Sequence, residues 1–252
     1  MEGAFPEWSG LDLVSKLISL AEYSGTYRSS GSVTTQVCEY WAGSSNLAAA
    51  HVEIGLRCRT FDKLYGSHHD CTTNLGLRYW LVELCCTDCR SLCWLGTQCS
   101  SFVKICVSKS HRRAANNFVG DETKPFVRDG NRQQLVASLI MFMSWCIGGR
   151  PVLEQPVSSV LPCMSPMKEV LAFVEARRSV TWLGHFGGPT PIPIQLWHCD
   201  PVHGKLRRKR LSRALDTLVK RWGKHFRGKS GPMKKSQEYP PMFCQAVAQL
   251  WC

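Results

Sequence analysis

The stretch TTQVCEYWAGSSNLAAAHVEI, residues 34–54, carries the pattern that decides the fold. Residues 35–41 predict an extended strand, and residues 42–45 form a turn of small residues around Gly43. Residues 46–54 follow with apolar side chains at helical spacing. A strand, a glycine turn and a helix in this order are typical of a unit whose next strand runs parallel to the first.

The same alternation continues along the chain. Further strands are predicted at residues 57–61, 91–95, 151–153, 180–183 and 192–197, the last as a returning strand, and helices at residues 75–86, 133–147, 166–176 and 244–251. Residues 104–132 are polar and punctuated by glycine and proline, which predicts a long loop beside the strand ends. We therefore expect an α/β, Rossmann-like, doubly wound fold with a mostly parallel sheet and a basic C-terminal helical extension.

Length and composition set the outer limits of the prediction. The chain has 252 residues, 44% of them hydrophobic and 20% charged, which suits one globular domain and excludes a disordered tail protein. We expect a flexible leader at residues 1–32, an α/β domain at residues 33–204 and a C-terminal segment at residues 205–252. The start lacks the pattern of a signal peptide, and the longest nearly apolar run, residues 135–147, is shorter than the roughly 20 residues that span a bilayer. The fourteen cysteines are therefore expected to be reduced thiols of an intracellular protein.

The net charge of +12 is concentrated in one segment. Residues 205–235 hold thirteen Lys or Arg and a single acid, whereas the rest of the chain balances 18 basic against 18 acidic residues. Apolar side chains at every third or fourth position of residues 205–227 predict an amphipathic basic helix. Concentrated positive charge favours a polyanionic partner, above all DNA or RNA. The residues expected to contact it are Arg207, Arg208, Lys209, Arg210, Arg213, Lys220, Arg221 and Lys224.

Three other interpretations of this segment stay open. The basic helix can be a solvated face packed on the sheet, or residues 205–210 can be a nuclear-import signal. It can also bind an anionic membrane surface, since charge alone does not distinguish one polyanion from another.

In an open α/β sheet, ligands bind beyond the carboxyl ends of the strands, so the residues that follow each strand are candidates for a site. Gly43 permits the tight turn that a nucleotide-type cofactor requires, and Asp62 is placed to accept hydrogen bonds from ribose hydroxyls. Asp70 is a candidate partner of an adenine amine. Cys99 lies at a turn, where a helix N-terminus can lower the pKa of a thiol, and Glu154 ends its strand at the same edge.

Each candidate also has a purely structural interpretation. Gly43 can belong to an ordinary loop, Asp62 can be a cap, and Cys99 can be a small buried apolar residue. Glu154 can pair with a nearby arginine. The Cys86-x-x-Cys89 pair has the spacing of zinc ligands, but a second pair at finger spacing is missing, so no metal site is expected.

Taken together, the order of these motifs resembles class I S-adenosylmethionine-dependent methyltransferases, most of all those of the cytosine-C5 type. The segments that carry the resemblance are YWAGSS (40–45), FD (61–62), GTQC (96–99) and LEQP (153–156). The chain is also similar to methyltransferase-like proteins of dinoflagellate genomes, through WAGS (41–44), FDK (61–63), CSSF (99–102), EQPVSS (154–159) and YP (239–240). The resemblance covers residues 35–250.

The resemblance implies S-adenosylmethionine as a cofactor and nucleic acid as the substrate. The cofactor-binding residues that it implies are Trp41, Gly43, Asp62 and Asp70. It gives Cys99 the role of adding to C6 of a flipped-out cytosine, and Glu154 contact with N3 of that base. A DNA or RNA methyltransferase homologue, active or degenerate, is therefore the first hypothesis. Ser45 and Gln98 stand where the family has Gly and Pro, so the alternative is a non-catalytic nucleic-acid-binding protein that keeps the fold.

Overall fold

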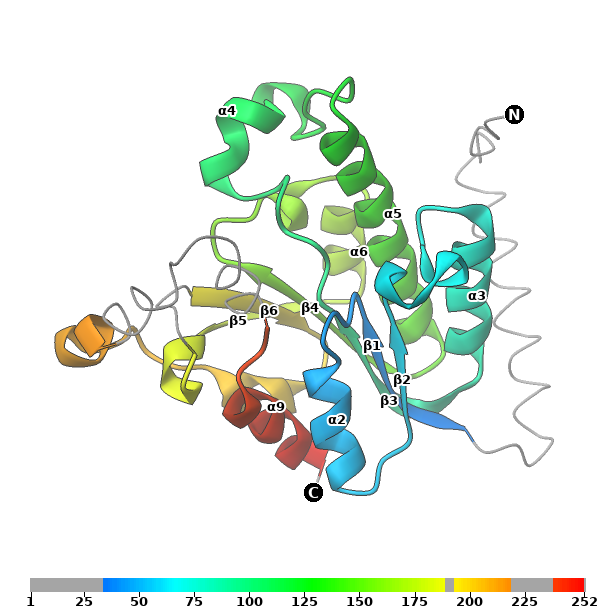
Figure 1. The fold of residues 1–252 in the computed structure, drawn as a ribbon, viewed down its shortest axis with the longest axis vertical. Coiled ribbons are helices and arrows are strands. Elements are labelled where there is room, and N and C mark those ends of the chain that lie inside the picture. Colours follow the sequence, from blue (N-terminus) through cyan, green and yellow to red (C-terminus); the bar gives the residue numbers. More distant parts are fainter. Residues whose placement is uncertain (1–33, 189–192, 219–237, 252) are drawn as a thin grey trace.

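In the computed structural model of the protein, residues 34–188, 193–218 and 238–251 are described, and a six-stranded sheet lies at their centre (Figure 1). The strands are β1 (Thr35–Tyr40), β2 (Cys58–Phe61), β3 (Thr87–Leu95), β4 (Arg150–Pro156), β5 (Arg177–Trp182) and β6 (Pro193–His198). The α-helices are α2 (Asn46–Glu53), α3 (Asn74–Cys85), α4 (Val107–Ser110), α5 (Pro125–Cys146), α6 (Met167–Phe173) and α9 (Pro241–Ala248). The 3-10 helices are η1 (Lys63–Tyr65), η2 (Ser67–His69), η3 (Lys104–Cys106), η4 (Ala114–Asn116), η5 (Leu161–Cys163), η6 (Leu183–Phe186), η7 (Pro201–Leu206) and η8 (Gln249–Trp251).

The strand order is β2-β1-β3-β4-β6-β5, with the first four strands parallel. β6 runs antiparallel to both of its neighbours, β4 and β5. From β1 the chain goes to β2 on one side and then returns to β3 on the other, so the winding direction reverses between β1 and β3. The prediction of an α/β fold with a mostly parallel sheet and a returning strand near residues 192–197 is confirmed.

Side chains of successive strand residues point to opposite faces of the sheet and feed two separate cores. Cys38 and Tyr40 point to the face covered by α3, α5 and α6. Val37 and Trp94 point to the other face, which α2 and α9 cover (Figure 1). The prediction that helices cover both faces is therefore confirmed. A residue at a strand end faces either α3, α5 and α6 or α2 and α9, depending on its position in the strand.

The predicted long loop at residues 104–132 is wrong. This stretch contains η3, α4 and η4, and α5 begins at Pro125, eight residues before the predicted start. The stretch is organised around the side chain of Arg112, which is only 2% exposed. The Arg112 guanidinium donates to the carbonyl oxygens of Ser101, Phe118, Val119 and Val127, to the hydroxyl of Ser101 and to Oδ1 of Asn131. Backbone carbonyls of this stretch and of Ser101 therefore bind a buried cation, which orders residues that were predicted to form a loop.

The predicted basic helix over residues 205–227 is also wrong at its start. Residues 207–212 are not helical, and a helix begins at residue 213 and continues to residue 218, where the described range ends. Leu206 and Leu211 are buried, and the backbone N–H of Arg208 donates to the carbonyl of Val180 in the edge strand β5 at 3.1 Å. A strand-edge hydrogen bond of this kind competes with a helical one for the same N–H. The predicted leader at residues 1–32 and residues 219–227 lie outside the described residues.

Candidate functional site

The four loops that follow β1, β2, β3 and β4 lie at one edge of the sheet. Parallel strands end at the same edge, and the register pairs Tyr40 with both Phe61 and Leu95, and Leu95 with Leu153. The four strands therefore finish level with one another. Gly43, Asp62 and Cys99 follow their strands, as the sequence predicted, and we call this edge the carboxyl rim. Glu154 was predicted to follow residues 151–153, but β4 continues to Pro156 because it pairs with β6, so Glu154 lies inside the strand near this edge.

The β1 and β2 loops are tied together at the carboxyl rim. Gly43 has a φ of 52° and its N–H donates to Oδ2 of Asp62 at 3.0 Å. Oδ1 of Asp62 accepts the N–H of Leu64 at 2.9 Å, which caps η1, and the hydroxyl of Tyr65 donates to the carbonyl of Gly43 at 2.8 Å. Each oxygen of Asp62 thus has one acceptor direction in use. Asp62 serves as both a cap and a clamp on the glycine turn.

The other two predicted cofactor residues are placed by packing. The ring of Trp41 meets that of Trp80 edge-on, with the centroids 4.9 Å apart. Oδ1 of Asp70 accepts from the N–H of Thr72 at 2.9 Å and from its hydroxyl at 2.7 Å, and the Asp70 carbonyl packs against Gly76 at the start of α3. Asp70 therefore shapes the turn into α3.

Cys99 and Glu154 lie close enough to interact, but the thiol is not activated. Burial, with a further contribution from the charge of Glu154, raises the pKa of Cys99 to about 11. The expected lowering of this pKa by a helix N-terminus is wrong, because the next helical segment, η3, begins only at Lys104, and the N–H groups of Phe102 and Val103 donate to the Cys99 carbonyl. The backbone N–H of Cys99 itself lowers this pKa, but by less than burial and Glu154 raise it. Burial also raises the pKa of Glu154 to about 7, so this carboxyl binds or releases a proton near neutral pH.

Glu154 is held by a residue that the analysis of the strand ends missed. The hydroxyl of Tyr239 donates to Oε2 of Glu154 at 2.8 Å and accepts from Nε1 of Trp94 at 3.0 Å. Glu39 lies on the same face of the sheet, where it is 1% exposed and accepts the N–H of Ala48 at 2.8 Å. Burial raises the pKa of Glu39 to about 7. The sequence signal that could have found Glu39 is that it is the one acidic residue in the otherwise uncharged predicted strand at residues 35–41.

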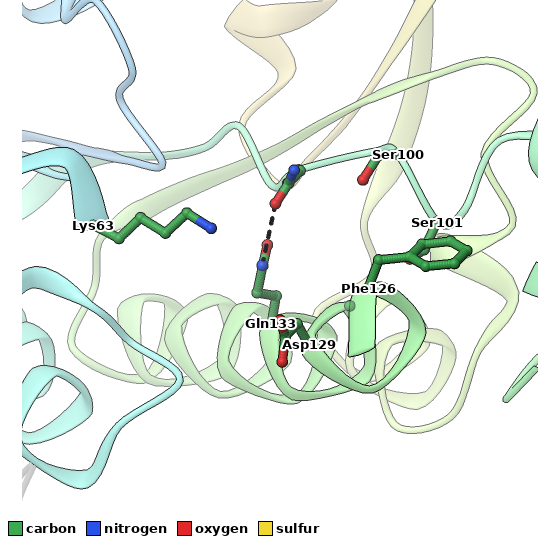
Figure 2. A pocket seen from close by; sticks show the side chains of 8 residues that line it. Lys63, Ser100, Ser101, Phe126, Asp129 and Gln133 are labelled. Atoms are coloured by element: carbon green, nitrogen blue, oxygen red, sulfur yellow. Dashed lines mark hydrogen bonds between the residues drawn. The ribbon is translucent and has the colours of Figure 1, made fainter. Parts of the chain in front are cut away.

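On the opposite face, the carboxyl rim contains a cavity of about 150 Å³ (Figure 2). Its walls come from η1, from the loop after β3 and from the first turns of α5. The residues that line it are Lys63, Gln98, Ser100, Ser101, Phe126, Asp129, Gly130 and Gln133. The sequence did not indicate this cavity because residues 125–132 were assigned to a loop.

Gln133 is the most informative residue of this cavity. It is 5% exposed, its Nε2 donates to Oε1 of Gln98 at a long 3.4 Å, and its own Oε1 has no hydrogen-bond partner among the described residues. Figure 2 shows the Lys63 side chain extending toward this glutamine pair. A buried amide oxygen without a donor costs about 1–3 kcal/mol. The cavity therefore offers an acceptor from α5 and a cation from η1 to a small polar ligand.

The predicted nucleic-acid residues are only partly described. Lys205, Arg207, Lys209, Arg210 and Arg213 are exposed. The Arg208 guanidinium lies over the ring of Phe186, 5.2 Å from its centroid, and donates to the carbonyls of residues 205 and 207. Lys220, Arg221 and Lys224 lie outside the described residues. Five basic side chains between residues 205 and 213 are thus exposed around Arg208, whose backbone is bonded to β5, and we call residues 205–213 the basic strap.

No model of a known protein family matches the chain, and no curated protein sequence is significantly similar to it. Among residues 34–188, 193–218 and 238–251, no group of His, Cys, Asp or Glu side chains is arranged to hold a metal ion. Within the same residues, no helix has both the length and the apolar character needed to cross a bilayer. The site must therefore be interpreted from its own geometry.

Proposed function

We propose that the protein is an S-adenosylmethionine-dependent nucleic-acid methyltransferase homologue with a Rossmann-like fold. The observation that carries the proposal is the carboxyl rim, where Gly43, Asp62 and Cys99 follow three parallel strands and Glu154 lies near the end of a fourth, beside a cavity. The reversal of winding between β1 and β3 lies at this rim, and open α/β sheets bind nucleotide-type ligands at such a reversal.

The cavity residues fit the adenosine end of the cofactor. The unpartnered Oε1 of Gln133 and the carboxylate of Asp129 are acceptors for an exocyclic amine. The Nε2 group of Gln98 and the Ser100 hydroxyl are donors for ring nitrogens, and the Phe126 ring lies at the wall. A cavity of about 150 Å³ accepts a ring of benzene size, so a base would extend toward the opening. When bound, the cofactor supplies the methyl group.

In this proposal, Glu154 donates a proton to the base and Cys99 is the nucleophile. A Glu154 carboxyl with a pKa of about 7 can carry a proton to the ring nitrogen of a flipped-out cytosine at neutral pH. Cys99 must lose its proton before it can act as a nucleophile, because its pKa of about 11 leaves the thiol neutral. The active geometry therefore requires a change around the thiol when substrate binds.

The basic strap supplies the affinity for nucleic acid in this proposal. Exposed Lys and Arg side chains that contact phosphates release counterions, so binding weakens as salt rises. Neutralising Arg207, Lys209 and Arg210 should remove about three contacts and make the salt dependence of binding correspondingly shallower.

Titration calorimetry with S-adenosylhomocysteine and the full chain tests the cofactor assignment. Gln133→Met and Lys63→Met should each weaken binding about tenfold or more, since each removes one polar contact of the ligand. Tyr79→Phe, in α3 beside Phe61 and outside the lining of the cavity, serves as the matched control and should bind as the wild type does. Absence of binding to the folded wild-type protein would reject the proposal.

A second candidate function is a nucleic-acid-binding protein without methyl transfer. The observation that favours it is the neutral, half-buried thiol of Cys99 beside a covered Glu154. In that case DNA or RNA binding should survive Cys99→Ala and collapse when residues 207–210 are neutralised. Binding that is unchanged after this neutralisation contradicts the second candidate.

A further inference from the structure

Tyr239 reaches the carboxyl rim from a distant part of the chain, 85 residues beyond Glu154. Its hydroxyl lies between two partners, accepting from Nε1 of Trp94 and donating to Oε2 of Glu154. Its backbone carbonyl accepts Nδ2 of Asn46, at the start of α2, at 3.2 Å. Three elements of the sheet and its helices therefore fix one tyrosine against one carboxylate.

The chain around Tyr239 is shaped for this approach. A Cβ placed on Gly96 would lie 2.9 Å from the Tyr239 hydroxyl oxygen, so only glycine leaves the hydroxyl its place. Pro240 and Pro241 start α9 directly after the tyrosine, and Pro at the first helical position is favourable for a helix start. The buried Phe243 of α9 then packs its ring 5.6 Å from that of Tyr239.

We propose that Tyr239 is a positioning residue for Glu154, and that residues 238–251 are therefore a structural part of the candidate site rather than a tail. The segment closes the α2 and α9 side of the carboxyl rim, while the Gln133 cavity opens on the other side. The proposal deepens the proposed function but does not require methyl transfer, because it concerns how one carboxyl of the folded chain is held.

The ionisable groups around Glu154 make this arrangement measurable. The Tyr239 hydroxyl lowers the pKa of Glu154 against the larger effect of burial, and an ionised Glu154 raises the pKa of Cys99 in the loop after β3. Cys106 adds a smaller contribution at Cys99, and Glu39 of β1 acts on Tyr239. The reactivity of Cys99 therefore reports the charge of Glu154.

The test is the pH profile of alkylation at Cys99 in the full chain, followed by peptide mass spectrometry with the exposed Cys163 as an internal reference. In the wild type, the logarithm of the rate should rise with pH and show a shoulder near pH 7, where Glu154 ionises and makes the thiolate harder to form. Glu154→Gln should abolish the shoulder and speed alkylation at pH 8 by about tenfold.

Tyr239→Phe should move the shoulder to higher pH and speed alkylation at pH 8 by about twofold or more, because Glu154 keeps its proton longer without the hydroxyl. Tyr79→Phe should leave the shoulder where it is. If circular dichroism finds that Tyr239→Phe does not fold, Gly96→Ala gives the same test, since its methyl group displaces the hydroxyl. A shoulder that stays at the wild-type pH in the folded variant overturns the proposal, as does a shoulder that persists in Glu154→Gln.

Discussion

The two sides of the carboxyl rim differ in how their polar groups are satisfied. On the α9 side, Tyr239 donates a hydrogen bond to Glu154 at 2.8 Å and accepts one from Trp94 at 3.0 Å. On the α5 side, Gln133 keeps an unpartnered oxygen, and the side-chain ammonium of Lys63 has no hydrogen bond or ion pair within the described ranges. Protein interiors rarely leave polar groups unpaired, so under the proposed function the chain itself completes the α9 side and a ligand completes the α5 side.

The largest expected effect concerns the scaffold of the α5 side. Arg112→Leu removes a guanidinium that serves at least four backbone carbonyls, and leaves those carbonyls buried without donors. We expect unfolding in urea at pH 7 to show a loss of about 3–5 kcal/mol. A loss below about 1 kcal/mol would mean that the carbonyls find other donors, and the α5 side would then not depend on Arg112.

Arg112 also shows what the sequence can and cannot predict. The strands β1 to β4 and the rim they share followed from alternation of apolar runs and glycine turns, which are local signals. The fold of residues 104–124 depends on one arginine finding carbonyls at positions 101, 118, 119 and 127, and no local pattern encodes such an arrangement. The cavity was missed because the first turns of α5, residues 125–132, which form one of its walls, were assigned to the same predicted loop.

The next largest expected effect is the pH dependence of stability that two buried glutamates on the α9 side cause. The pKa of Glu154 and that of Glu39 are about 7 in the folded chain, against 4.5 for an ordinary glutamate. The folded chain thus binds more protons than the unfolded chain between these values, so stability is highest below about pH 4.5 with respect to these groups and falls as the pH rises to 7. Each carboxyl contributes on the order of 3 kcal/mol to this fall.

Glu154→Gln should remove its share of the fall, so the variant gains stability over the wild type at pH 8 and not at pH 4.5. Urea unfolding at pH 4.5, 6, 7 and 8 measures this difference. Equal pH dependence in the two proteins would show that Glu154 is better solvated than its burial implies, and the α9 side would then not be closed.

A smaller effect is expected from the hydroxyl that completes this side. Tyr239→Phe keeps the ring packing but leaves Nε1 of Trp94 without its acceptor and Glu154 without its donor. We expect a loss of about 1–2 kcal/mol in the free energy of unfolding at pH 8, where Glu154 is ionised. The matched variant Ser100→Ala, on the α5 side, should change stability by less than about 0.5 kcal/mol because its hydroxyl has no partner among the described residues.

Tyr239 also marks a limit of sequence interpretation. The YP pair at residues 239–240 belonged to the resemblance, but nothing in the sequence connected it with Glu154 or with Gly96. The connection is tertiary, because it arises from α9 packing beside α2 on one face of the sheet. The basic residues 207–212 failed as a helix prediction for a related reason, since the edge of β5 takes a backbone N–H that a helix would have used.

The smallest effect has the opposite sign and tests the comparison most directly. Gln133→Met removes a buried amide whose oxygen has no donor and replaces it with an apolar side chain of similar length. We expect the variant to be as stable as the wild type or more stable by up to about 1 kcal/mol in urea, while its affinity for S-adenosylhomocysteine falls. A residue that costs stability in the free chain and contributes to binding is expected only where a ligand completes the site. A destabilisation above about 1 kcal/mol would instead make Gln133 a structural residue, and the two sides of the carboxyl rim would then both be completed by the chain itself.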